Sequence, residues 1–122
     1  MLTFLQELIK VKGNQVAPAE LEGLLLEHPA IQDAAVVGVT ISGEELPRAY
    51  LVRQGSETGR AATAKGVADW MAERVARHKR LMGGVVFIDV IPKNPSGKIL
   101  RKGLRERAAK EVGDGGQRES KL

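Results

Sequence analysis

The sequence contains no cysteine and few aromatic residues, and each shortage excludes a kind of site. Without cysteine the chain can form no disulfide, no thiolate nucleophile and no cysteine zinc site. The two histidines, His28 and His78, are isolated, so we expect no metal centre. Aromatic residues make up only 3% of the chain, which is too few for a surface that stacks the bases of single-stranded nucleic acid.

Long hydrophobic runs are also missing. No apolar stretch approaches the roughly 20 residues that cross a bilayer, and residues 1–10 lack the apolar core of a secretory signal. We therefore expect a soluble chain with no membrane partner. Its 122 residues suit one domain, and 43% hydrophobic residues are enough to form a core.

The net charge of +4 is unevenly distributed. Residues 1–60 carry five Lys and Arg against eight Asp and Glu, whereas residues 61–122 carry fourteen against seven. Seven basic residues lie between Lys93 and Lys110, where Glu106 is the one acidic residue. This cluster indicates either an anionic partner or the solvated face of a helix.

The spacing of apolar residues and turn formers predicts an α+β domain. Gly13 permits a positive φ in a tight hairpin turn, and Pro18 suits the first turn of a helix that His28-Pro29 would end. The predicted elements are a hairpin at 8–16, a helix at 18–28, strands at 33–40 and 48–53 joined by a loop at 42–45, a helix at 62–76, a buried strand at 83–89 and a helix at 99–112. We expect a two-layer domain with a small mixed β-sheet, an N-terminal β-hairpin and about three helices.

Ser96-Gly97-Lys98 is the most informative segment for chemistry. Lys98 follows a loop that contains proline and glycine and precedes the start of a helix. A lysine in this position can bring a point charge to a phosphoryl or carboxylate oxygen. The segment is not a P-loop, because position 92 is not glycine and Ile99 replaces the hydroxyl residue. A turn with an exposed lysine is the alternative.

Five segments of the chain together carry a family resemblance. They are ELIKVKGNQVAPAELE at 7–22, HP at 28–29, DAAV at 33–36, GEELPRA at 43–49 and PKNPSGKILR at 92–101. In this order and spacing they resemble the C-terminal lid domain of AMP-forming acyl-CoA synthetases, closest to the 4-coumarate:CoA ligase and beetle luciferase branch. The resemblance covers about residues 5–110, so we assign 1–112 to the lid domain and 113–122 to a flexible tail.

The resemblance implies a reaction in two steps, between which the lid rotates. A carboxylate attacks the α-phosphate of ATP, bound with Mg²⁺, to give an acyl-adenylate and pyrophosphate, and the CoA thiol then displaces AMP. Lys98 is similar to the catalytic lysine that spans carboxylate and phosphate oxygens during adenylation. Lys10 resembles the residue that faces the acyl-adenylate during thioester formation, and Gln15 resembles a nearby adenylate contact. Lys12 and Gly13 match positions along the CoA channel.

The residues themselves agree in part with these assignments. Lys10 and Lys12 are two apart in a predicted strand, so we expect them to share one face. Lysines that protect an edge strand from pairing are the alternative explanation.

The chain departs from the family in two respects. Thr3-Phe4-Leu5-Gln6 stands where the family usually has Asp-Arg-Leu-Lys, so two nucleotide contacts and a hinge residue are lost. The large N-terminal domain that binds ATP and the acyl group is also absent from these 122 residues. We therefore expect the chain to hold no cofactor by itself and to be inactive without an N-terminal adenylate-forming domain, supplied in cis or in trans.

The last three residues match an import signal. Ser120-Lys121-Leu122 is the peroxisomal targeting tripeptide, and the glycine-rich approach from Gly113 to Gly116 would let a receptor reach it. We therefore expect the chain in the peroxisome, with the import receptor as a partner.

Two further hypotheses remain open. The segment at 93–110 could make the chain a non-catalytic basic module that binds an anionic protein, nucleotide or nucleic acid, for which no single lysine would matter. The chain could also be the lid of a peptide-synthetase adenylation domain. The segment KGNQVAPAELE at 12–22 and the C-terminal targeting tripeptide argue against this alternative.

Overall fold

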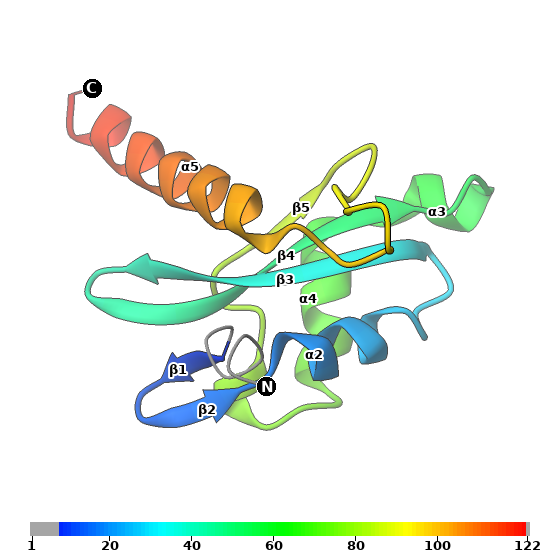
Figure 1. Ribbon diagram of the computed structural model, residues 1–122, viewed down its shortest axis with the longest axis horizontal. Coiled ribbons are helices and arrows are strands. Elements are labelled where there is room, and N and C mark those ends of the chain that lie inside the picture. Colours follow the sequence, from blue (N-terminus) through cyan, green and yellow to red (C-terminus); the bar gives the residue numbers. More distant parts are fainter. Residues whose placement is uncertain (1–7, 122) are drawn as a thin grey trace.

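The computed structural model describes residues 8–121, and the side chains of residues 8–113 (Figure 1). The elements are β1 (Ile9–Val11), β2 (Asn14–Val16), α2 (Pro18–Leu25), β3 (Ile31–Ile41), β4 (Glu44–Arg53), α3 (Glu57–Ala61), α4 (Ala64–Ala72), the 3-10 helix η1 (Arg77–Lys79), β5 (Val85–Phe87) and α5 (Arg101–Lys121). The predicted α+β class, the N-terminal hairpin and the mixed sheet are confirmed. Within the described residues, no helix is long and apolar enough to span a membrane.

Two tight turns join the antiparallel strand pairs. Lys12 and Gly13 between β1 and β2 have φ values of 50° and 85°, and Ser42 and Gly43 between β3 and β4 have 53° and 81°. Two central residues with positive φ define the type I′ turn, whose twist matches that of paired strands. Gly13 therefore acts as the sequence predicts.

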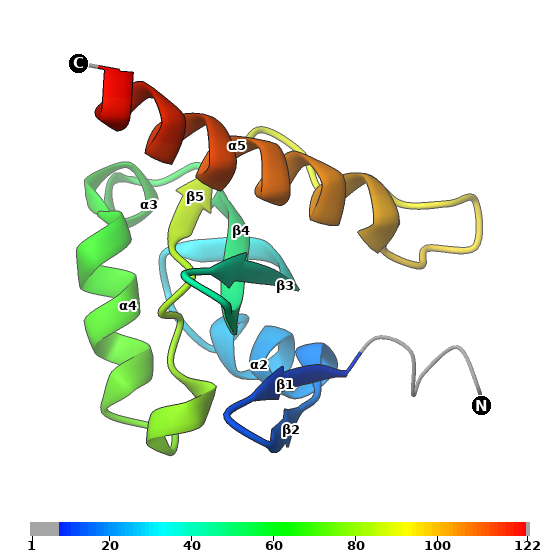
Figure 2. The ribbon, with the colours of Figure 1, turned by 90° about the vertical axis from the view of Figure 1, so that its left-hand side faces the viewer.

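The three-stranded sheet has the order β3-β4-β5, with β3 antiparallel and β5 parallel to β4. One face carries the larger core, to which the β1–β2 hairpin, α2 and α4 contribute buried side chains such as Ile9, Leu21 and Met71. The other face packs against Leu104 and Ala108 of α5. Figures 1 and 2 show α5 on one side of the sheet and α2 and α4 on the other, so α5 adds a layer to the two that the sequence predicts.

The strand pair β3–β4 is longer than predicted, and the expected loop at 42–45 is only a two-residue turn. Pro47 lies inside β4, where proline normally argues against a strand. Ala49 donates its N–H to Gly84 on the β5 side, so the N–H that Pro47 lacks would point to that side as well. The proline therefore leaves the β3–β4 ladder intact.

Other boundaries also differ from expectation, and the helices predicted at 18–28 and 62–76 span only Pro18–Leu25 and Ala64–Ala72. The strand expected at 83–89 is confined to β5, and its residues are half-buried at the edge of the sheet rather than buried. The short helix α3 begins at 57, inside the glycine-bounded break, because the Ser56 hydroxyl accepts the N–H of Gly59 and caps it. The last helix continues to Lys121 through the glycines at 113–116, where the sequence predicts a flexible tail, since glycine weakens a helix without forbidding it.

A polar network fixes α5 to the sheet. Glu111 of α5 accepts hydrogen bonds from Arg48 and Tyr50 of β4, each at 2.8 Å, and from Arg107 at 2.7 Å. Arg48 also donates to the Gly83 carbonyl at 2.8 Å. Burial raises the pKa of Glu111, but the three hydrogen bonds outweigh it and lower that pKa from 4.5 to about 2.

This network predicts a pH-dependent contribution to stability. Because the pKa of Glu111 is lower in the folded state, its contribution is present above about pH 4.5 and is lost as the pH falls toward 2. We expect urea unfolding to show Glu111→Gln less stable than wild type at pH 7, with a difference that shrinks below pH 4.5. Glu106→Gln, an exposed change on the same helix, should not show this trend. A difference for Glu111→Gln that stays constant between pH 7 and pH 2 would contradict it.

Candidate functional site

Lys98 lies on an exposed segment between β5 and α5, residues 92–100, called the Lys98 loop below. Lys93 and Ile99 pair as an antiparallel bridge, so the loop closes on itself. Gly97 has a φ of 91°, a conformation that favours glycine. Within the described side chains Lys98 forms no ion pair, and it is presented to solvent.

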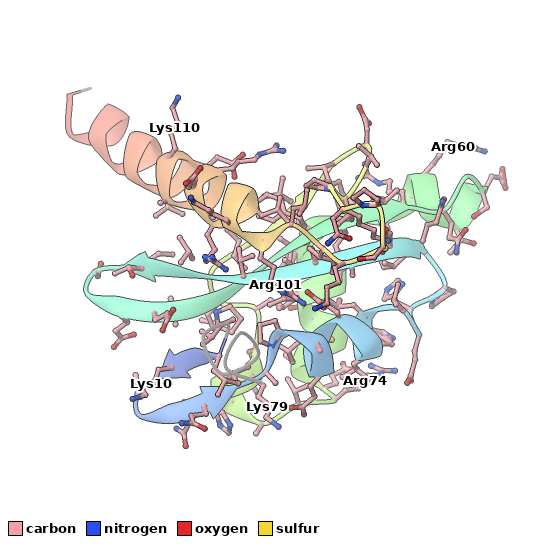
Figure 3. All side chains as sticks on the ribbon, in the orientation of Figure 1. Lys10, Arg60, Arg74, Lys79, Arg101 and Lys110 are labelled. Atoms are coloured by element: carbon pink, nitrogen blue, oxygen red, sulfur yellow. The ribbon has the colours of Figure 1, made fainter. Side chains whose placement is uncertain are left out.

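Two ion pairs anchor the loop at its ends. Lys93 at its start contacts Asp33 of β3, with the lysine nitrogen 2.7 Å from a carboxylate oxygen. Arg101 follows its end as the first residue of α5 and pairs with Glu22 of α2 through two guanidinium nitrogens. The Arg101 and Glu22 side chains are only 11% and 9% exposed, so this pair is buried. Figure 3 shows Arg101 between the start of α5 and β3.

The Glu22–Arg101 pair also completes the edge of the sheet. β3 is an edge strand, and an edge strand has backbone groups without a ladder partner. The N–H of Val36 donates to Glu22 at 2.8 Å, and the Val36 carbonyl accepts from Arg101 at 2.9 Å. The two side chains therefore substitute for a further strand and join α2 to α5 around this edge.

A second candidate surface is the β1–β2 hairpin. Lys10 and Gln15 are direct cross-strand partners, so they lie on the same face, as their shared adenylate role would require. Ile9 and Val11 are buried on the other face, which leaves Lys10 exposed. The Lys10 N–H donates to the Glu45 carboxylate at 2.9 Å, which fixes the hairpin against β4.

Lys12 and Gly13 occupy the turn of the hairpin. The expectation that Lys12 shares a strand face with Lys10 is wrong, because Lys12 has a φ of 50° in the turn and the alternation of a strand does not extend to it. Its side chain is 72% exposed, and the amine lies 4.0 Å from a carboxylate oxygen of Glu44. Such a surface pair constrains a lysine only weakly.

A groove of about 530 Å³ lies beside this turn and is called the η1 groove below. Its lining contains three apolar side chains (Val11, Leu46 and Met82), three cationic ones (Lys12, Arg77 and Arg80), and Asn14, Glu44 and His78. The sequence pattern indicated Lys12 but not the cations of η1 and Arg80. No spacing rule links these residues to the hairpin, because only the fold brings η1 against β2.

The Lys98 loop and the hairpin lie apart, at different corners of the domain in both Figure 1 and Figure 2. The structure therefore brings Lys10, Gln15, Lys12 and Gly13 together and leaves Lys98 on a separate surface. Two separate cationic surfaces are what the family resemblance requires of a domain that acts in two orientations.

The structure describes only part of the residues that bear on a metal site and on the C-terminal tripeptide. Among the side chains of residues 8–113, no group of three or more His, Asp or Glu residues is arranged to hold a metal ion. Ser120 and Lys121 belong to the end of α5, but their side chains lie outside the described residues, as does Leu122 entirely.

With this geometry in place, the family follows from comparison. Residues 20–98 match the model of the AMP-binding enzyme C-terminal domain, and the chain belongs to this family. The match ends at Lys98 and includes Glu22, Arg48, Arg77 and Arg80. The resemblance carried by the five sequence segments is thereby confirmed.

Individual relatives are acid–thiol ligases. The chain is 48% identical over 120 residues to a putative acyl-coenzyme A synthetase of Emericella nidulans, with 96% of this chain and 20% of that protein covered. It is 52% identical to 4-coumarate–CoA ligase 2 of Nicotiana tabacum, with 86% and 19% covered. Among solved structures, it resembles o-succinylbenzoate CoA synthetase from Bacillus subtilis in complex with its acyl-adenylate intermediate, at a TM-score of 0.72 and 34% identity, with 82% of this chain and 20% of that chain covered. The chain thus spans about a fifth of the length of the relatives it matches.

The buried Glu22–Arg101 pair should show strong energetic coupling. Removing either partner breaks this largely buried ion pair, and breaking such a pair costs about 3–5 kcal/mol. We expect Arg101→Met and Glu22→Met each to lower the free energy of unfolding by about 3 kcal/mol, and the double variant to lower it by clearly less than the sum. Urea unfolding of all four proteins measures this coupling.

The exposed pair Lys65–Asp69 supplies the matched control. The same cycle at these two positions should give no measurable coupling, because solvent screens both charges. Additive effects of Glu22→Met and Arg101→Met would contradict the structural role given to the buried pair.

Proposed function

We propose that this domain acts as the lid of an ATP-dependent, AMP-forming carboxylate:CoA ligase. In the first step a carboxylate oxygen bonds to the α-phosphorus of ATP and pyrophosphate leaves. In the second step the CoA sulfur bonds to the acyl carbon and AMP leaves. The single observation that carries the proposal is Lys98, an exposed cation without an ion pair in the described region, on a loop anchored at both ends.

Lys98 supplies a positive charge during adenylation. Negative charge builds up on the oxygens of the α-phosphate and on the departing pyrophosphate as the carboxylate attacks, and a preorganised cation lowers the free energy of that transition state. The ion pairs with Asp33 and Glu22 hold the two ends of the loop, which reduces the conformational freedom that the loop must lose when the lid closes.

Lys10 and Gln15 act in the second step, when the lid presents its hairpin to the acyl-adenylate. Support comes from their position on one exposed face of the hairpin. The adjacent η1 groove fits CoA, because its cations can pair with phosphate groups while Val11, Leu46 and Met82 contact apolar parts of the molecule. In this proposal Lys12 and Gly13 line the route of CoA.

The partner is an N-terminal adenylate-forming domain, joined to the lid or supplied separately. The described residues provide neither a phosphate-binding loop nor an acyl pocket. The relatives include a 4-coumarate–CoA ligase, which supports an aromatic carboxylate as the class of acid. The choice of acid belongs to the partner domain.

A non-catalytic basic module is the second candidate. It is favoured by the exposed cations Lys102, Arg105 and Lys110 along α5, and Figure 3 shows Lys110 pointing away from the sheet. Such a module would depend on total charge and not on one lysine at one position.

Complementation separates these two functions. The pure chain should catalyse no ATP–pyrophosphate exchange with any carboxylate, and adding it to the N-terminal domain of a related 4-coumarate–CoA ligase should restore some adenylation. Lys98→Ala should lower the restored rate by about a hundredfold or more. Lys10→Ala should spare adenylation and slow thioester formation, because the two lysines act in different lid orientations.

Lys102→Ala is the matched control for charge. Lys102 is exposed and follows closely after Lys98, but it lies within α5 and outside the loop. Equal, small effects of Lys98→Ala and Lys102→Ala would contradict the lid mechanism and support the basic module.

We also propose a peroxisomal location, from the tripeptide Ser120-Lys121-Leu122. A fluorescent protein fused in front of the chain, with this end free, should collect in peroxisomes, and deletion of Leu122 should leave the fusion in the cytosol. Diffuse fluorescence of the undeleted fusion would overturn the proposed location.

A further inference from the structure

Asn94 makes most of the hydrogen bonds inside the Lys98 loop. Its side-chain oxygen accepts from the Ser96 N–H at 3.0 Å, the Ser96 hydroxyl at 2.8 Å and the Lys98 N–H at 2.9 Å. Its own N–H donates to the Lys98 carbonyl at 2.8 Å, and its carbonyl accepts from Gly97 at 2.9 Å. Both backbone groups of Lys98 therefore bond to one residue.

These hydrogen bonds hold the tip of the loop, residues 95–98, which is exposed to solvent. Residues 95–98 are exposed, whereas Asn94 is half-buried beneath them. The ion pairs at Asp33 and Glu22 fix the two ends of the loop but do not reach its tip. A loop tip without internal bonds would sample many backbone conformations, and ordering it on closure would cost binding free energy.

We propose that Asn94 is a positioning residue, which fixes the backbone of Lys98 before the lid closes. The inference rests on the proposed function for the catalytic role of Lys98, but the positioning itself is a property of the chain alone. Asparagine suits this task because its amide oxygen accepts several hydrogen bonds without adding a negative charge beside the lysine.

Amide hydrogen exchange of the ¹⁵N-labelled full chain tests the positioning directly. Asn94→Ala should speed exchange of the Lys98 N–H about tenfold or more, because that amide loses its acceptor, while core amides such as that of Tyr50 keep their protection. Asn94→Asp retains an acceptor oxygen and should keep the Lys98 amide protected at neutral pH. Ser96→Ala removes a different donor and should leave the Lys98 amide unchanged.

Each result decides the proposal. Unchanged exchange of Lys98 in Asn94→Ala would overturn it. Equal loss of protection in Asn94→Ala and Asn94→Asp would also overturn it, because the accepting oxygen would then not be what holds the amide.

Adenylation with the complementing N-terminal domain supplies a second readout. Asn94→Ala should lower kcat about tenfold or more and leave KM for ATP nearly unchanged. A misplaced lysine stabilises the transition state less, but it does not change how tightly the substrate binds. Lys102→Ala, an exposed change outside the loop, should match wild type. A rise in KM with unchanged kcat would contradict positioning. If the wild-type chain fails to complement, the proposed function fails, while amide exchange still decides the role of Asn94.

Discussion

The buried pair of Glu22 and Arg101 is the interaction on which the rest of the structure most depends. It joins α2 on one face of the sheet to α5 on the other, and it satisfies the backbone of Val36 at the open edge of β3. A pair this deeply buried gains little over an apolar contact in stability, but it is costly to break and specific in geometry. Because Arg101 directly follows the Lys98 loop, the same pair fixes the C-terminal end of that loop.

The cations of this domain fall into two groups according to their partners. Arg48, Lys93 and Arg101 are held by carboxylates, and each fixes one element against another. Lys10 and Lys98 have no ion pair in the region that the structure describes, yet the backbone N–H of each donates a hydrogen bond to a side-chain oxygen, of Glu45 and Asn94 respectively. A fixed backbone under an unpaired amine gives a charge that is ready to meet an anion without prior rearrangement. That combination, rather than the net positive charge, distinguishes the lid from a general basic surface.

Local chemistry explains which features the sequence could predict. Gly13 and Pro18 set a turn and a helix start through their own backbone preferences, and Lys98 was recognisable from its immediate neighbours. The predicted strand at 48–53 is shorter than β4, which also contains Pro47. Proline is tolerated there because the N–H that it lacks would face β5 and not β3, and the position of β5 is not visible in the local sequence. The η1 groove and the Glu22–Arg101 pair bring together residues far apart in the chain, and no local pattern encodes such contacts. The same limit applies to Glu45, whose bond to the Lys10 amide spans two hairpins.

We propose that the domain meets an acyl-adenylate through two defined surfaces, the Lys98 loop and the β1–β2 hairpin. Titration of the ¹⁵N-labelled chain with the N-terminal domain of a related ligase, carrying a stable acyl-adenylate analogue, tests it most directly. We expect the largest amide shifts on residues 94–98 or on residues 10–15. Shifts confined to the exposed cations of α5, and removed by moderate salt, would contradict it and leave a basic surface that binds by charge alone.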